Sequence, residues 1–290
     1  MDTGAPIGES TEPGNGRMAQ LTGLAAVLFL AACISSLFGQ GGGVLYAPVQ
    51  LWLGVPPHLA AAQSLLLVLV TSVSSTLVYH SREETDWLLC VILEIPTGLG
   101  ASMGGYLSSR LPQHVLGWML CFLLVLAAIA VRVLYRRAAQ NTVPIRPRRF
   151  GVLIRRFGGK EYALNLWLIS PVMFAVGLLT SAVGLGGGIL KLPAMVLLFG
   201  IPWRIAVGSS AFMVGVTAFA GLAGHIYVGH LIWTPRLLLY ALAVFTGAQV
   251  GSRVSHIVNQ TSLQTALSWF LLITAAVTFV RVTYFLPPPA

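Results

Sequence analysis

GQGGGVLYAP (residues 39–48) and GLGGGILKLP (residues 184–193) are two copies of one pattern, and each copy interrupts a long apolar run. A glycine cluster breaks a helix and frees backbone N–H groups, which lipid cannot satisfy. Such a break is stable in a bilayer only where it is buried in protein or lines a cavity. Two breaks in corresponding places are typical of transporters, whose substrate sites lie at discontinuous helices.

The composition of the chain is that of a membrane protein. Apolar residues make up 56% of the sequence and charged residues 9%, whereas a soluble domain carries about 25% charged residues. Most of the apolar runs approach the roughly 20 residues that a spanning helix needs. These runs are residues 19–38, 59–79, 87–109, 111–131, 162–190, 205–224, 237–252 and 254–280. Two shorter segments, 44–55 and 189–201, follow the glycine clusters and are expected to be half-helices or re-entrant segments.

The internal repeat extends well beyond the glycines. The Gly-Val-Pro at 54–56 is matched by the Gly-Ile-Pro at 200–202, and the GASMG at 100–104 by the GAQVG at 247–251. His80 is matched in the same way by His225. The glycines at 100–104 and 247–251 are expected to form helix-packing seams, as small residues commonly do in membranes.

The sequence therefore predicts an all-α polytopic membrane protein of about eight transmembrane helices in two homologous halves, each with a glycine-broken or re-entrant first helix. Four crossings per half would make the halves parallel, which is the arrangement we favour. An extra crossing by each half-helix would invert them and place the acidic N-terminal tail outside the cell. The expected parts are a disordered tail (1–18), a first repeat (19–137), a basic linker (138–161) and a second repeat (162–286).

The net charge of +9 is concentrated in the linker, because nine of the 17 basic residues lie between Arg132 and Lys160. Basic loops beside spanning helices determine topology through the positive-inside rule. We therefore expect a multi-pass protein of the plasma (inner) membrane with the linker at 138–161 in the cytoplasm. The lipid bilayer is the expected partner of this charge, and nucleic acid is not.

The repeated motifs resemble those of a known family. They are the doubled Gly-x-Gly-Gly-Gly-hydrophobic pattern with proline five residues on, the Ala- and Ser-containing start of the next helix, and the Gly-Ala-x-x-Gly of the third. Together they resemble the TauE/SafE sulfite exporter family over nearly the entire chain. The resemblance implies a carrier for sulfite, sulfoacetate or a related sulfur-containing anion. The halves differ at Tyr46 against Lys191 and at Gln63 against Ser209, so they are expected to contribute unequally.

The candidate substrate site is built on the two helix N-termini after the glycine clusters. Each free N-terminus carries about half a positive charge and several N–H donors, which suit the oxygens of sulfite or a sulfonate. Lys191 lies in an otherwise uncharged region and can add a full positive charge. The predicted substrate-binding residues are Gly41, Gly42, Gly43, Gln63, Ser64, Gly186, Gly187, Gly188, Lys191, Ser209 and Ser210.

Each of these residues also has a purely structural interpretation. The glycines can serve tight helix crossing, the polar side chains interhelical hydrogen bonding, and Lys191 can extend to the membrane interface. Glu94 can pair with Lys191, carry a proton, or lie near a helix end. His80 and His225 are expected at the membrane interface, with pH coupling as the alternative.

We therefore expect a secondary transporter that exports sulfite or an organosulfonate by alternating access. An importer or a carrier of another small anion remains an alternative, and a non-transporting membrane scaffold or receptor subunit is the alternative of another class. The sequence contains no nucleophile, metal-ligand or nucleotide-binding motif, so we expect no enzyme, cofactor or metal site. The three cysteines are expected to be packing residues, and a homo-oligomer is compatible with the sequence.

Overall fold

The computed structural model describes residues 14–138, 151–230, 234–255, 257 and 260–285 of the 290-residue chain. The parts of the predicted tail and linker at residues 1–13 and 139–150 lie outside these ranges. Helices before the central hairpin are α1 (Gly14–Ser36), α2 (Gly43–Trp52), α3 (Pro57–His80), α4 (Trp87–Leu107) and α5 (Gln113–Ala138), with one 3₁₀ turn at Ser108–Arg110. Helices after it are α6 (Leu166–Ala182), α7 (Gly188–Pro193), α8 (Trp203–Tyr227), α9 (Pro235–Val254) and α10 (Gln260–Phe285).

Within the described residues, five helical segments are long and apolar enough to cross a membrane. They are Pro57–His80, Trp87–Arg110, Gln113–Val133, Trp203–Tyr227 and Pro235–Val254. Four shorter apolar stretches accompany them: Thr22–Ser36, Leu166–Ala182, Gly188–Leu198 and Leu271–Val280. The protein is therefore a predominantly helical, multi-pass membrane protein, as its composition predicts.

Both glycine clusters break a helix. Helix α1 ends at Ser36 and α2 begins at Gly43, with Gly42 at its N-cap in the left-handed region at φ 82°. Gly187 has the same φ of 82° at the N-cap of α7. Helix α7 continues directly into a π-helical turn at Ala194–Leu198. The short segments expected at 44–55 and 189–201 are thus short helices, because glycine allows the positive φ that stops one helix and starts the next.

The all-α prediction places no strand in the central linker, but the structure contains two there. Strands β1 (Val152–Phe157) and β2 (Lys160–Asn165) form an antiparallel hairpin with Phe157 opposite Lys160. Gly158 and Gly159 form the turn with φ of 56° and 72°, which is the geometry that closes a two-residue hairpin. The hairpin takes up residues 162–165, so α6 begins only at Leu166. At the other end of the chain, α1 begins at Gly14, inside the tail expected to be disordered.

The helices pack in pairs that link the two parts of the chain. Helix α4 packs on α6 and α8, while α9 packs on α1 and α3; α3 also packs on α8, and α5 on α10. The predicted glycine seams form two of these contacts. Gly100 and Gly104 of α4 lie against backbone carbonyls of α6, and Gly247 and Gly251 of α9 lie against backbone carbonyls of α1. These helices approach so closely that a β-carbon at any of the four glycines would clash.

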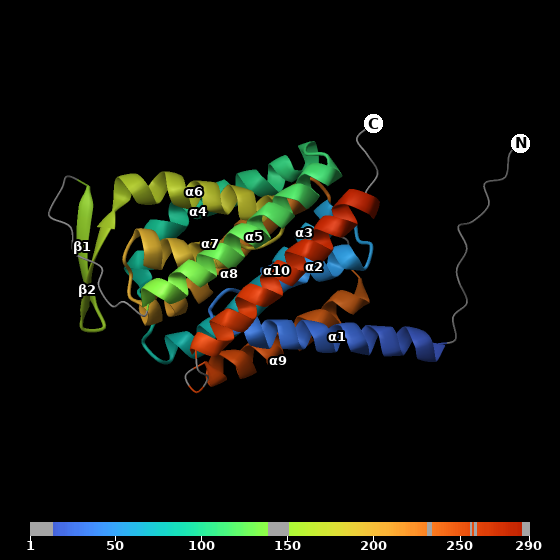
Figure 1. Ribbon diagram of the computed structural model, residues 1–290, viewed down its shortest axis with the longest axis horizontal. Helices are drawn as coiled ribbons and strands as arrows, with labels where there is room; N and C mark the ends of the chain where they lie inside the picture. Colours follow the sequence, from blue (N-terminus) through green and yellow to red (C-terminus); the bar gives the residue numbers. More distant parts are fainter. Residues whose placement is uncertain (1–13, 139–150, 231–233, 256, 258–259, 286–290) are drawn as a thin grey trace, which may run out of the picture.

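The corresponding helices α3 and α8 run antiparallel. Leu65 near the start of α3 lies against Gly221 near the end of α8, and Ser72 lies against Gly215 in the middle of both helices. Beyond the end of α3, Glu84 lies against Gly208, near the start of α8. The beginning of α1 and the end of α10 lie toward one end of the molecule, and the hairpin lies at the other (Figure 1). The parallel arrangement favoured from the sequence is therefore wrong for these helices.

Candidate functional site

The two glycine clusters meet in the interior of the protein. A β-carbon at Gly43 would clash with the carbonyl oxygen of Leu185, and one at Gly188 would clash with the carbonyl oxygen of Gln40. Each cluster therefore touches the backbone of the other, although they lie far apart in the sequence. Residues 38–48 and 180–195 are buried throughout. The structure thus brings together Gly41, Gly42, Gly43, Gly186, Gly187 and Gly188 of the predicted site.

The amides of these glycines have no acceptor among the described residues. Leu45 and Tyr46 donate their N–H groups to the carbonyl oxygen of Gly42, and Leu190 and Lys191 donate theirs to that of Gly187. No such bond is found within the described part of the chain for the N–H groups of residues 41–43 or 186–188. Buried N–H groups of native proteins are nearly always paired. Two sets of unpaired donors therefore converge where the helices α2 and α7 begin.

Ser72 of α3 is a polar neighbour of the first cluster that the sequence analysis missed. Its hydroxyl oxygen lies 2.8 Å from the position that a β-carbon on Gly41 would take. This hydroxyl is buried and has no hydrogen-bond partner among the described residues. The repeat pattern gave no sign of Ser72, because the equivalent position in α8 is Ala218.

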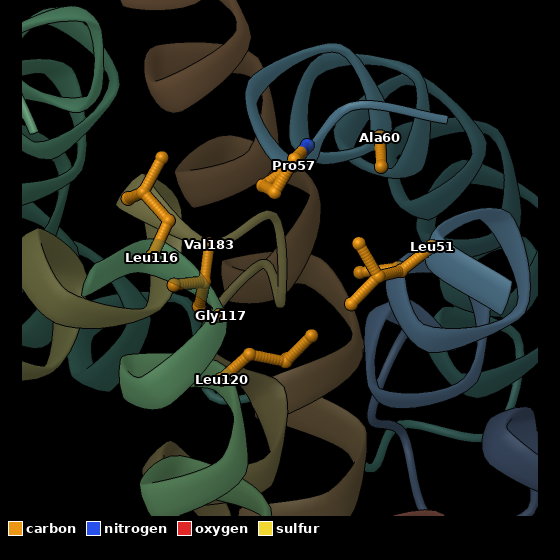
Figure 2. Close-up of a pocket in the computed structure, with 8 residues that line it drawn as sticks. Leu51, Pro57, Ala60, Leu116, Gly117, Leu120 and Val183 are labelled. Carbon is orange, nitrogen blue, oxygen red and sulfur yellow. The ribbon is translucent and has the colours of Figure 1, made fainter. Parts of the chain in front are cut away.

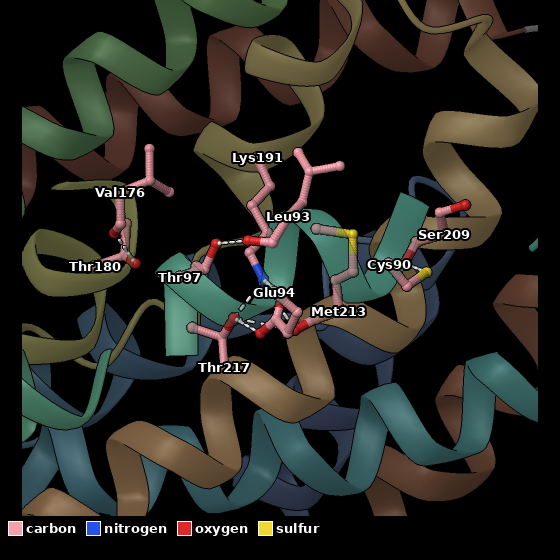
Figure 3. Close-up of polar contacts among 10 residues, drawn as sticks. All are labelled: Cys90, Leu93, Glu94, Thr97, Val176, Thr180, Lys191, Ser209, Met213 and Thr217. Atoms are coloured by element: carbon pink, nitrogen blue, oxygen red, sulfur yellow. Dashed lines mark hydrogen bonds and ion pairs between the residues drawn. The ribbon is translucent and has the colours of Figure 1, made fainter. Parts of the chain in front are cut away.

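Lys191 lies at the centre of a buried polar cluster (Figure 3). Its ammonium group donates to Oε2 of Glu94 at 2.6 Å, to the carbonyl oxygen of Met213 at 2.9 Å, and to the hydroxyl of Thr217. The Thr217 hydroxyl also contacts Oε1 of Glu94. The Lys191 side chain is 0% exposed and that of Glu94 7%. Lys191 therefore does not extend to the membrane interface, and Glu94 forms an ion pair with it.

Three helices supply this cluster. Lys191 lies on α7, three residues after Gly188. Glu94 comes from α4, and Thr217 comes from α8. The Cε atom of Lys191 lies 3.4 Å from the β-carbon position of Gly187, so the lysine stem packs against the second glycine cluster. A buried charge is tolerated only when it is paired and hydrogen-bonded. Lys191 and Glu94 meet this condition, because they are paired and hydrogen-bonded. Through Lys191, the pair lies next to the second glycine cluster.

The corresponding place in the first half has a neutral pair. The hydroxyl of Tyr46 lies 2.8 Å from that of Thr71, and both side chains are buried. Tyr46 and Thr71 occupy the positions of Lys191 and Thr217 in the repeat. Both halves thus place a threonine hydroxyl against the residue at this position, but only the second half has a charged residue there. The difference between Tyr46 and Lys191 in the sequence predicts this.

The four remaining predicted site residues lie in different surroundings. Ser64 donates its hydroxyl to the carbonyl oxygen of Gly184 at 2.8 Å, next to the second glycine cluster. The hydroxyl of Ser210 is buried without a partner among the described residues. Ser209 instead accepts the N–H of Asp86 at 3.0 Å, and Gln63 is half-buried near the start of α3. Ser209 is therefore tied to the α3–α4 loop.

His225 is buried near the end of α8. Its Nε2 lies 3.1 Å from the carbonyl oxygen of Ser181, while His80 is exposed. The side chain that matches His225 is that of Tyr79, whose hydroxyl donates to the carbonyl oxygen of Ser36 at 2.7 Å. The sequence match of His80 with His225 is thus displaced by one residue.

Asp86 ties the central hairpin to the helices. Its carboxylate caps α4 by accepting the N–H groups of Leu88 and Leu89. It also accepts two hydrogen bonds from Arg155 at 2.9 and 3.1 Å and one from Tyr162 at 2.6 Å. Burial alone raises the pKa of the Asp86 carboxyl, but the hydrogen bonds from Arg155, Tyr162 and the Leu89 N–H outweigh it and hold the pKa below its usual value.

A small cavity lies between α2, α3 and α5, lined entirely by apolar side chains and glycine (Figure 2). Its volume of about 10 Å³ is at the lower limit for a single water molecule. None of the predicted site residues lines it. The glycine clusters themselves are packed against each other and buried.

The chain was compared with known proteins. A model of the sulfite exporter TauE/SafE family matches residues 24–278. The chain is 31% identical over 245 residues to the probable membrane transporter protein YunE of Bacillus subtilis (strain 168), which covers 80% of this chain and 85% of that protein. It is 28% identical over 233 residues to the probable membrane transporter protein ORF9 of Sinorhizobium sp, covering 79% and 82%. No solved structure matches the chain significantly.

A more distant relative comes from an archaeon. The probable membrane transporter protein MJ0441 of Methanocaldococcus jannaschii is 23% identical over 263 residues, which cover 86% of this chain and 91% of that protein. These alignments extend over most of both chains, and the range matched by the family model includes both glycine clusters.

Proposed function

Because the chain belongs to the sulfite exporter TauE/SafE family, we propose that it is a secondary transporter that exports sulfite or an organosulfonate by alternating access. Membrane transport is supported by the relatives, which are named as membrane transporters, and by the several helices able to span a bilayer. The substrate, the direction and the site are the proposal.

The observation that carries the proposal is the convergence of unpaired backbone donors at residues 41–43 and 186–188. Lipid cannot satisfy these N–H groups, so they need a ligand or a cavity in the working protein. A small oxyanion offers several acceptor oxygens, and a helix N-terminus favours negative charge. We place the anion between the starts of α2 and α7, with the hydroxyls of Ser64, Ser72 and Ser210 at its edge.

The remaining members of the predicted set have other roles in this proposal. Lys191 supplies a full positive charge close to Gly187. Gln63 lies near the start of α3 and Ser209 near the start of α8. In this proposal they contact the opposite half where these helix starts move against it. The described arrangement encloses the glycine clusters, so the anion enters when the two halves shift and separate them. This matches the requirement of alternating access that the site open to one side at a time.

The helix contacts support two equivalent halves, and the antiparallel run of α3 and α8 supports their inversion. Exchanging the halves turns the contact of α4 with α6 into that of α9 with α1, and the contact of α4 with α8 into that of α9 with α3. The contacts α3–α8 and α5–α10 are unchanged by the exchange. We infer five passes in each half, the extra one being made by the short helix α2 or α7 together with the glycine segment before it. With the basic linker in the cytoplasm of a cell whose plasma membrane holds the protein, both termini face outward.

The direction of transport follows from charge. A negative-inside membrane potential contributes about 2.3 kcal/mol per elementary charge for each 100 mV and favours the exit of net negative charge. No driver other than ion and anion gradients is suggested by the sequence, which has no nucleotide-binding motif.

The proposal is tested with purified protein in liposomes and radiolabelled sulfite. We expect saturable sulfite uptake that sulfoacetate or thiosulfate inhibits and chloride does not. Lys191→Ala should weaken uptake at least tenfold, whereas Cys121→Ala, which changes a buried side chain of α5, should leave it unchanged. Absence of saturable sulfite uptake would favour a scaffold or receptor role. Inhibition by chloride alone would indicate a carrier for another anion.

A further inference from the structure

The ammonium group of Lys191 has no donor left for a substrate in the described arrangement. It has three N–H bonds, and they are directed to Glu94, to the Met213 carbonyl and to the Thr217 hydroxyl. Met213 and Thr217 both belong to α8 and are held one turn apart by a hydrogen bond of 3.0 Å. Glu94 is the partner on a different helix, α4. An anion can therefore reach Lys191 most readily by replacing Glu94.

Replacing an ionised Glu94 creates an electrostatic problem. The anion and the carboxylate would both lie near one ammonium group in a buried site, where repulsion between like charges is strong. Two negative groups that share such a site are stable only when one of them binds a proton. Protonation converts Glu94 into a neutral carboxylic acid, which no longer competes for the charge of Lys191.

We infer that Glu94 carries one proton together with each anion, so that the protein couples anion movement to proton movement. This inference rests on the proposed function and deepens it. The carboxylate accepts a proton from the water on the side where the anion enters, and the anion takes its place on Lys191. On the other side, the anion leaves, the carboxylic acid returns its proton to water, and the ion pair re-forms. Lys191 keeps its three protons throughout.

Thr217 is suited to follow this exchange. Its hydroxyl accepts from Lys191 and has two acceptors within reach, Oε1 of Glu94 and the Met213 carbonyl. When Glu94 is ionised, the hydroxyl donates to it. When Glu94 is protonated and withdrawn, the hydroxyl can rotate and donate to Met213. The Thr217 hydroxyl therefore keeps an acceptor in both states, which lowers the cost of the switch.

The surroundings of Glu94 make it the single proton carrier of the cluster. Among the described residues, helix α7 directs the charge of Lys191 at it, and α8 contributes only the hydroxyl of Thr217. The other titratable group nearby is the thiol of Cys90, one turn earlier on α4, which faces the carbonyl oxygen of Ser209. The matching place in the first half has the neutral pair of Tyr46 and Thr71, so one proton per anion is expected.

Coupling to one proton remains compatible with export. A sulfite dianion that moves with one proton still transfers one net negative charge, which the membrane potential drives outward. A singly charged organosulfonate would move without net charge and would follow its own gradient and that of protons.

The test uses the full-length protein in liposomes with the membrane potential set to zero and methanesulfonate as the labelled anion. Its sulfonate stays ionised, so any proton that accompanies it is carried by the protein. With the interior one pH unit more alkaline, coupling of one proton to one anion predicts about tenfold accumulation, since one pH unit corresponds to a tenfold ratio. Glu94→Gln should reduce the ratio to about one, and Glu83→Gln, which neutralises an exposed carboxylate, should leave it near ten.

The outcomes separate the two proposals. Uptake of sulfite or methanesulfonate with no accumulation in the pH gradient would overturn the coupling but leave the transporter standing. Absence of any uptake of either anion by the native protein would overturn both. If Glu94→Gln transports nothing, Glu94→Asp, which keeps a carboxylate, must restore both transport and accumulation. Restored transport without accumulation, or persistent accumulation in Glu94→Gln, would remove Glu94 from the role.

Discussion

At the scale of single residues, the ion pair between Lys191 and Glu94 should dominate the response to mutation. Removing one partner of a buried pair leaves the other charge uncompensated, which costs about 3–5 kcal/mol. We therefore expect Lys191→Met to lower the thermal unfolding temperature in detergent strongly. Replacing both residues, Lys191→Met with Glu94→Met, should recover most of the loss, because a well-packed apolar pair removes both charges. Losses that simply add in the double variant would show that the two charges are not coupled.

The glycines where the two clusters meet should tolerate no side chain. A β-carbon at Gly188 would clash with the carbonyl oxygen of Gln40, whereas one at Gly98 of α4 meets no atom within 4 Å. Gly188→Ala should therefore abolish sulfite uptake in liposomes, with any loss of folding monitored by size-exclusion chromatography. Gly98→Ala should be neutral or slightly stabilising, since alanine favours a helix by about 1 kcal/mol over glycine. Normal uptake by Gly188→Ala would place the anion elsewhere.

Sequence reasoning located the residues that recur in the repeat and missed those that depend on packing. The glycine clusters and Lys191 stand out because the pattern returns and because a charge interrupts an apolar run. The partner of Lys191 could not be chosen from the sequence, since it depends on α4 lying between α6 and α8. Thr217 and Ser72 gave no signal at all, because single hydroxyl residues are common in membrane helices, where they bond to the backbone. Whether these residues bind substrate remains a prediction.

At the scale of elements, the long helices follow from apolar runs of spanning length, but the hairpin of the linker does not. Its stability depends on contacts outside the strands, above all those of Asp86 with Arg155 and Tyr162. Basic residues at 155 and 156 read as topology signals in the sequence, and nothing in it indicated that Arg155 would pair with an acid 69 residues away. The Gly158-Gly159 pair is a hairpin signal. The many basic residues around it favour a linker, so the sequence predicts a linker and no hairpin.

The attachment of the hairpin should depend on pH. Since the pKa of Asp86 lies below its usual value in the folded protein, the ionised carboxylate stabilises the fold above the ordinary carboxyl pKa of about 3.9. This contribution is lost as the pH falls through the lower folded-state pKa. Hydrogen exchange at residues 152–165, corrected for intrinsic rates, should therefore accelerate on acidification below that range.

The control for this effect is Asp86→Asn. The amide cannot form the ion pair with Arg155, so the hairpin should exchange faster at neutral pH and show little further change on acidification. A hairpin that exchanges equally in the native protein and in Asp86→Asn at neutral pH would show that Asp86 does not hold it.

At the scale of the whole molecule, the antiparallel run of α3 and α8 sets the topology. It places Tyr227 at the end of α8 on the side opposite Lys160 in the hairpin, and Ile257 after α9 on the same side as Lys160. Single cysteines introduced at these three exposed positions into a cysteine-free background report the sides. A membrane-impermeant maleimide should label Tyr227→Cys in intact cells, and Lys160→Cys and Ile257→Cys only after permeabilisation. Labelling of Ile257→Cys but not Tyr227→Cys from outside would indicate parallel halves.

The sequence could not fix this topology, because it depends on whether a short helix after a glycine break completes a crossing or returns. Segments of 10 and 6 residues, as in α2 and α7, are too short to cross alone, and both outcomes satisfy the same apolar pattern. The packing of Gly43 on Leu185 and of Gly188 on Gln40 requires long-range contacts that no local signal contains.

Selective ¹⁵N labelling of glycine tests most directly whether the backbone donors of the two glycine clusters bind the anion. Amide resonances of Gly41, Gly42, Gly43, Gly186, Gly187 and Gly188, assigned by substitution, are followed while sulfite is titrated into the purified protein. We predict saturable shifts in both clusters at one common sulfite affinity, with Gly98 unaffected. Saturable sulfite transport by the same preparation, with the amides of both clusters unmoved, would contradict it.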